Sequence, residues 1–355
     1  MSFVHRLCKK VFGKTFIWKR LKQIKFLIKV RFNKIAYSME MELPLRLGKN
    51  NPNKIFYLIG YYQTEWFVEQ GVISTWLDFM PQVLYALSKG YVPIIDMLNN
   101  YKPMMLDEKN RGRINAWDLY FSQPQNDYTL EEALNSEKVI FGKDQTNISL
   151  SDDIKWSNIP LADTDFNICQ EMLKYGNLSK TIVQNGDSFI RKNFPSGKKI
   201  LGISFRREFE QLHYFNSWIT PPGTHIVRTT LSELVETIKK VLKEIKYDKF
   251  FFIADDREAY DVVKRLFGDK CLYSERPVRH SFMDNKPIPL DRKDLIYVEY
   301  DKRDDDCMLR EMEYMTDVYI LSKCDSLLSA GGSADLFAYL LNNKKYENVI
   351  QLRDK

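Results

Sequence analysis

The sequence has few of the residues that build metal sites or disulfide frameworks. Only five of its 355 residues are cysteine and four are histidine. The cysteines are odd in number, form no C-x-x-C pair and lie far apart, at Cys8, Cys169, Cys271, Cys307 and Cys324. Neither a zinc site nor a set of disulfides is therefore indicated. A reducing compartment and the absence of a metal site are the simplest expectations.

Acidic residues and long apolar runs are both missing from the start of the chain. Residues 1–34 contain eleven lysines and arginines and no acid, although the whole chain has a net charge of only +6. The remainder is thus mildly acidic, which argues against a protein built to bind nucleic acid. The longest apolar runs in this segment are three residues each, at 16–18 and at 26–28. They are too short for a transmembrane helix or a cleaved signal.

What this segment does have is helical spacing of its apolar residues. We expect a basic amphipathic helix over residues 1–34 that lies on an anionic membrane surface. The contacts would come from Arg6, Lys9, Lys10, Trp18, Lys19 and Arg20. That places the protein in the cytoplasm, peripheral at the inner face of the cell membrane. Two alternatives stay open, a basic helix packed on its own domain and an arm that touches nucleic acid.

Strands and helices alternate through the rest of the chain. In the second half we expect strands at 198–205, 250–254, near 271, 326–330 and 348–352, and helices at 231–245, 257–267, 305–323 and 334–342. In the first half, strands at 55–60 and 91–96 flank a helix at 74–88, and one helix covers 163–193. Such alternation predicts parallel sheets with helices on both faces. The expected domains are 35–195 and 196–355.

Polar clusters follow three of these strands, where ligands of parallel sheets bind. Arg206 and Arg207 could hold a phosphate through their planar guanidinium groups, or form surface salt bridges. Asp255 and Asp256 could accept from ribose or sugar hydroxyls or bind a metal through oxygen, or Asp256 could cap the next helix. The run Gly331-Gly332-Ser333 could bring backbone amides to a phosphate, or make a tight turn.

Two further features invite the same choice between function and structure. Asp317 lies in an otherwise apolar helix, so its charge needs a partner such as an arginine or a base N–H. The run 71–76 precedes a helix and could contact a ligand, but an ordinary serine cap, Ser74, is the favoured interpretation. Ser232 is the expected cap of the helix at 231–245.

Taken together, four motifs over residues 198–343 resemble the fucosyltransferase-like superfamily of the α-1,6- and protein O-fucosyltransferases. They are Gly202-Ile203-Ser204-Phe205-Arg206-Arg207, Phe252-Ile253-Ala254-Asp255-Asp256, Thr316-Asp317-Val318-Tyr319-Ile320-Leu321-Ser322 and Gly331-Gly332-Ser333. The first half is similar to bacterial proteins of surface-polysaccharide loci at residues 88–96 and 115–124. The resemblance implies a GT-B-like fold, that is, two Rossmann-like domains facing across a cleft, with the donor in the second domain.

The resemblance also implies roles for single residues. Arg206 would hold the β-phosphate of the donor, with Arg207 as the second arginine. Asp317 would read the base, guanine in GDP-fucose, and Ser333 would contact the diphosphate. Transfer would be inverting and would need neither a metal nor a cofactor beyond the nucleotide-sugar.

Two departures from the family pattern leave the catalytic base open. Ser204 stands where a histidine is usual, and Glu208-Phe209 stands where Thr-Asp is usual. Glu210 is the favoured base, with Glu208 and His213 as alternatives. The expected activity is transfer of a sugar, with fucose favoured, onto a glycan or lipid-linked glycan in surface polysaccharide synthesis, with no nucleic acid partner. The rival expectation is a non-catalytic, membrane-associated sugar- or nucleotide-binding protein of the same fold.

Overall fold

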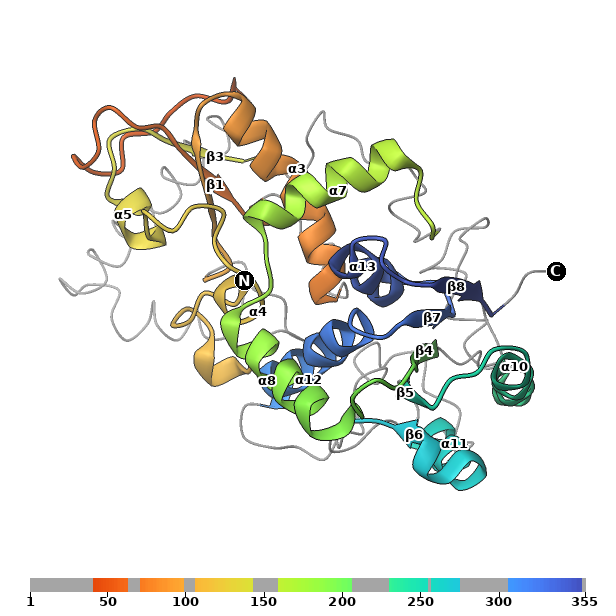
Figure 1. Ribbon diagram of the computed structural model, residues 1–355. Helices are drawn as coiled ribbons and strands as arrows, with labels where there is room; N and C mark the ends of the chain where they lie inside the picture. Colours follow the sequence, from red (N-terminus) through yellow and green to blue (C-terminus); the bar gives the residue numbers. More distant parts are fainter. Residues whose placement is uncertain are drawn as a thin grey trace, which may run out of the picture.

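A computed structural model describes residues 41–62, 71–98, 106–142, 159–205, 230–254, 257–274 and 306–352. These residues form an α/β molecule with two separate parallel sheets (Figure 1). The predicted fold class, two α/β units built on parallel sheets, is therefore confirmed. The boundary between residues 195 and 196 and the cleft between the domains stay predictions. The basic helix at 1–34 lies outside the described residues.

The second sheet has five parallel strands in the order β6-β5-β4-β7-β8. Their bounds are β4 Ile200–Phe205, β5 Lys249–Ala254, β6 Cys271–Leu272, β7 Ser326–Ser329 and β8 Asn348–Gln351. The chain runs from β4 outward to β6, returns, and continues on the other side of β4 with β7 and β8. This is the classical dinucleotide-binding strand order, 3-2-1-4-5-6, without its last strand. The reversal between β4 and β7 is its topological switch point.

Helices cover both faces of this sheet because its strands are buried on both sides. Alternate strand residues join two cores, so Leu201 and Phe250 pack beneath α10 (Leu231–Glu244) and α11 (Arg257–Phe267). Ile200 and Phe251 face the other core with α12 (Asp306–Leu321) and α13 (Ser333–Asn342). A short 3-10 turn, η3 (Gly268–Lys270), leads from α11 into β6. Four helices thus cover the two faces of the sheet. A ligand can then bind at the ends of the strands.

The first sheet has three parallel strands in the order β2-β1-β3. They are β1 Phe56–Ile59, β2 Val92–Ile95 and β3 Val139–Phe141. Helix α3 (Val72–Ser88) packs on one face, and the short α5 (Leu130–Leu134) packs against the core of the other face. The remaining elements of this half are η1 (Glu108–Asn110), α4 (Trp117–Tyr120), α7 (Asp163–Tyr175) and α8 (Lys180–Asn193).

The two halves share one hydrophobic core. Trp76 of α3 meets Phe337 of α13 edge to face, with ring centroids 5.2 Å apart. Helix α8 packs along α12, and the Tyr319 hydroxyl donates to Asp187 at 2.8 Å. Asp107 accepts hydrogen bonds of 3.2 Å from the backbone amides of Cys307 and Met308, so an acid of the first half caps α12. The halves are therefore joined by packing and by a helix cap.

The structure corrects one predicted helix. Residues 163–193 form two helices because Gly176 ends α7, and its carbonyl accepts from the Trp76 indole at 2.8 Å. A Cβ at Gly176 would lie 2.6 Å from the Met80 sulfur, so the break sits where the chain passes closest to α3. The apolar spacing continues through both helices, which is why the sequence pattern did not show the break.

Two predicted caps are also wrong. Helix α3 begins at Val72 with Gly71 as its N-cap, so Ser74 lies inside its first turn. The N-cap of α10 is Thr230, whose side chain accepts from the amide of Glu233 while Glu233 returns the bond to Thr230. Ser232 is exposed within that first turn. Strand β3 was not predicted, because its three residues are too few to show a period.

Helices in the described part of the chain are all too short or too polar to cross a bilayer.

Candidate functional site

A pocket lies at the switch point of the five-stranded sheet. Ser204 and Phe205 of β4, Ile253 and Ala254 of β5, and the segment from Gly331 to Asp335 after β7 line it, together with Tyr314 of α12. Strand order places the pocket here, because β5 and β7 flank β4 and their connections leave on opposite faces of the sheet. Open α/β sheets bind their ligands at such a crevice.

The loop between β7 and α13 requires glycine at two consecutive positions. Gly331 has φ 73° and Gly332 has φ 150°, both outside the range that side chains readily allow. A Cβ on Gly332 would meet no atom within 4 Å, so the backbone conformation, and not crowding, demands this glycine. Gly332 is also the N-cap of α13, and no side chain caps the helix there. The first amides of α13 and its positive dipole end therefore face a ligand site.

A buried carboxylate holds this loop in place. The Asp335 side chain is 1% exposed, and its Oδ2 accepts from the Ser329 hydroxyl at 2.7 Å. The Ser329 oxygen in turn accepts from the amide of Gly331 at 3.0 Å. Ser329 thus links the acid in the first turn of α13 to the first glycine of the loop. Replacing either residue is expected to loosen the conformation of Gly331.

Burial raises the pKa of Asp335 from 3.8 to about 6. Hydrogen bonding from the hydroxyls of Ser329 and Ser204 and from the amides of Ala330 and Gly331 favours the charged form, but burial outweighs it. Oδ1 makes no hydrogen bond of good geometry with any part of the chain that the structure describes. Ser204 and these amides are therefore close to the carboxylate without satisfying that oxygen.

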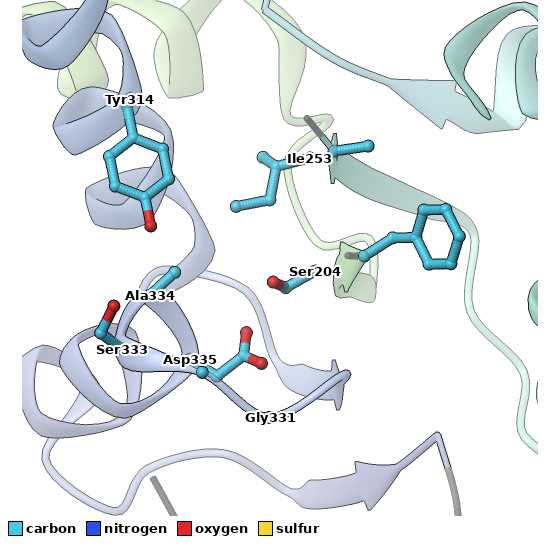
Figure 2. Close-up of a pocket in the computed structure, with 10 residues that line it drawn as sticks. Ser204, Ile253, Tyr314, Gly331, Ser333, Ala334 and Asp335 are labelled. Carbon is cyan, nitrogen blue, oxygen red and sulfur yellow. The ribbon is translucent and has the colours of Figure 1, made fainter. Parts of the chain in front are cut away.

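Hydroxyl groups complete the pocket wall. Figure 2 shows the Ser204 hydroxyl and the Asp335 carboxylate pointing toward each other, while the Tyr314 hydroxyl points down toward Ser333. Ile253 adds an apolar side chain to the same wall. The described wall thus combines hydroxyls, loop amides and one buried acid with apolar side chains such as Phe205 and Ile253. Such a surface suits a ligand with phosphate and hydroxyl groups.

The structure brings together part of the predicted site. Gly331, Gly332 and Ser333 line the pocket, as predicted for phosphate contacts. Asp317 is fully buried in α12, one turn beyond Tyr314, and does not belong to the described lining. Five predicted residues lie outside the described residues, namely Arg206, Arg207, Glu210, Asp255 and Asp256. The predicted membrane contacts Arg6, Lys9, Lys10, Trp18, Lys19 and Arg20 also lie outside them.

Sequence reasoning missed Asp335, Ser329 and Tyr314. Asp335 carried the same signal that singled out Asp317, an acid followed by an apolar helical run, here Leu336-Phe337-Ala338. Its position three residues after the Gly332 cap also fits an acid that reaches back to the start of the helix. Ser204 was noticed only as a departure from a family pattern, yet it lines the pocket.

The motif at 115–124 has a structural role in the first half. Gln123 accepts from the amide of Ile95 at 2.9 Å and donates to its carbonyl at 3.1 Å. Asn115 accepts from the amide of Met97 at 2.9 Å and also donates to the Ile95 carbonyl. These two amide side chains satisfy the outer edge of β2, an edge strand of its sheet. The motif therefore secures the end of a strand.

Within the ranges that the structure describes, no group of three or more acidic, histidine or cysteine side chains could hold a metal ion.

Comparisons with known proteins gave similarity to solved structures alone. No family model and no curated protein matches the chain. The chain is similar to the fucosyltransferase NodZ from Bradyrhizobium at 15% identity, over 81% of this chain and 93% of that chain, with a TM-score of 0.43. It is likewise similar to POFUT1 in complex with GDP at 10% identity, over 86% of this chain and 99% of that chain, with a TM-score of 0.43.

Proposed function

We propose that this protein is a glycosyltransferase that uses a nucleotide-diphospho-sugar, with GDP-fucose as the favoured donor. The acceptor is a glycan, and the product enters surface polysaccharide synthesis. A lipid-linked acceptor at the membrane would also explain the basic N-terminal segment. The observation that carries the proposal is the pocket at the switch point, lined by the Gly331-Gly332-Ser333 loop. A loop with two glycines of positive φ that opens a buried helix suits a diphosphate.

Two arginines that we expect to bind the donor lie next to this pocket in the sequence. Arg206 and Arg207 follow directly on Phe205, the last residue of β4, and Phe205 lines the pocket. Guanidinium groups at that point would meet the phosphates that the loop amides bind from the other side. The order of motifs along residues 198–343 resembles that of the fucosyltransferase-like superfamily, which favours a guanine nucleotide.

In the proposed reaction an acceptor hydroxyl attacks the anomeric carbon of the donor sugar. A new glycosidic C–O bond forms as the bond to the diphosphate breaks, and inversion follows from attack opposite the leaving group. Arg206, the glycine loop and the dipole of α13 stabilise the negative charge that grows on the diphosphate. A carboxylate, Glu210 by preference, takes the hydroxyl proton. Holding both substrates in one site supplies much of the remaining acceleration.

Removal of the Arg206 guanidinium tests this assignment. Arg206→Ala should weaken GDP-fucose binding by at least about tenfold and abolish fucosyl transfer, because a charged hydrogen bond to phosphate is lost. The matched control is Arg265→Ala, an exposed arginine of α11 whose loss should leave both unchanged. Equal binding and equal turnover in the Arg206 variant would show that the phosphate site lies elsewhere. Tight binding without any turnover in the wild type would favour the non-catalytic binding protein.

A further inference from the structure

The carboxylate of Asp335 sits where the proposed function needs an anion to bind. Asp335 lines the pocket with the loop that is assigned to the diphosphate, and its side chain is 1% exposed. Oδ2 accepts from Ser329, whereas Oδ1 makes no hydrogen bond of good geometry within the described ranges. Figure 2 shows that the carboxylate group faces the Ser204 hydroxyl. A buried oxygen without a bond at the wall of a pocket is costly unless a ligand or a proton satisfies it.

The groups that surround Asp335 offer hydrogen bonds and no described positive charge. Ser329 comes from β7 and Ser204 from β4. Two phenols also belong to the described surroundings of the pocket and its carboxylate. Tyr314 on α12 lines the same pocket, and the pKa of Tyr346, before β8, is raised well above its usual value, mainly by burial and in part by Asp335. Asp317 on α12 is a second fully buried acid in this half. The phenols carry no positive charge that would help an ionised Asp335 to accept an anion.

We propose that the pocket binds the diphosphate of its ligand together with one proton, which Asp335 carries on Oδ1 and donates to a phosphate oxygen. This inference rests on the proposed function, because it concerns the same ligand at the same loop. The proton comes from solvent and returns to it when the ligand leaves, so no covalent bond to the ligand changes. Asp335 then holds the loop in place through Ser329 and donates a hydrogen bond to the phosphate through Oδ1.

The chemistry favours this form for two reasons. An ionised carboxylate beside a diphosphate places like charges in contact in a poorly solvated site, which raises the pKa of the carboxyl further. Burial raises the pKa of Asp335 to about 6 in the absence of a ligand. Protonation of Asp335 at neutral pH therefore requires only a modest further rise of its pKa. In the alternative arrangement, an arginine pairs with Asp335 and keeps its carboxylate ionised. Ligand binding would then take up no proton.

Proton uptake on binding is the direct test. Titration calorimetry of the full chain with GDP-fucose at pH 7.5, repeated in buffers of different ionisation enthalpy, gives the number of protons taken up. We expect about one proton for the wild type, and an affinity that falls up to about tenfold per pH unit above pH 6. Asp335→Asn is neutral at every pH, so its uptake should be close to zero and its affinity flat. The exposed Asp269→Asn is the matched control and should behave as the wild type does.

The outcomes separate this inference from the function on which it rests. Binding of GDP-fucose by the wild type with no proton uptake overturns the role of Asp335 and leaves the donor site standing. Uptake that persists in Asp335→Asn assigns the proton to another group, such as His213, and overturns it equally. No binding at any pH removes both proposals. If Asp335→Asn does not fold, as judged by its thermal unfolding, uptake by the wild type still decides whether a proton enters with the ligand.

Discussion

At the scale of single residues, the molecule places buried acids next to polar backbone. Asp335 and Asp317 are both fully or almost fully buried, at 1% and 0% exposed. Spacing along the sequence shows that each interrupts an apolar helical run, which is enough to single out such an acid. What Asp335 contacts depends on Ser204 and Ser329, which come from strands, and on a loop whose φ angles cannot be derived from the sequence pattern.

The raised pKa of Asp335 makes stability depend on pH. Because its pKa is about 6 in the folded chain and 3.8 ordinarily, the folded chain binds this proton more tightly than the unfolded chain. The contribution is fully present below about pH 4 and is lost as pH rises through about 6, a change of about 3 kcal/mol.

Asp335→Asn removes this dependence, since an amide does not titrate. Urea unfolding at about pH 3 and about pH 7 should show the free energy of unfolding of the wild type falling by about 3 kcal/mol relative to the variant. A difference between the two proteins that stays constant over this range would mean that folding does not shift the pKa of Asp335. This measurement needs no ligand and therefore does not depend on the proposed function.

At the scale of secondary structure, periodicity predicted the elements better than their ends. Helix α11 at Arg257–Phe267 has the predicted bounds, because its apolar spacing is regular and Gly268 follows it. The caps of α3 and α10 were wrong by several residues, because serine, threonine and glycine near a helix start are all suitable N-caps. The break at Gly176 comes from contact with α3, which lies far away in the sequence.

The cap of α10 gives a direct check at this scale. Thr230→Ala removes the hydroxyl that accepts from the Glu233 amide, while the amide of residue 230 can still donate to Glu233, and it should lower the free energy of unfolding by about 1 kcal/mol. Ser232→Ala is the matched control, two residues further on and exposed, and should change it by less than about 0.5 kcal/mol. Chemical denaturation measures both. A larger loss for the serine variant would restore the cap predicted from the sequence.

At the scale of the whole molecule, the sequence predicted two α/β units but not how they join. Alternating strands and helices predict parallel sheets, and right-handed connections restrict their order. The packing of α8 on α12, the Trp76–Phe337 contact and the Asp107 cap are long-range contacts without a local signal. The pocket was predictable in position, since strand ends mark the edge of a parallel sheet, but its wall draws on α12 and on both neighbours of β4.

A thermal-shift screen against GDP-, UDP-, CDP- and TDP-sugars tests the central claim most directly. A ligand that binds only the folded chain raises its melting temperature according to its concentration over its affinity. We predict selective stabilisation by GDP-fucose, lost in Gly332→Ala because alanine strains the loop at φ 150°. Ser232→Ala, at an exposed position in the first turn of α10, is the control that should keep the shift. Stabilisation by none of these sugars, or an equal shift in Gly332→Ala, would contradict a donor site at the end of β7.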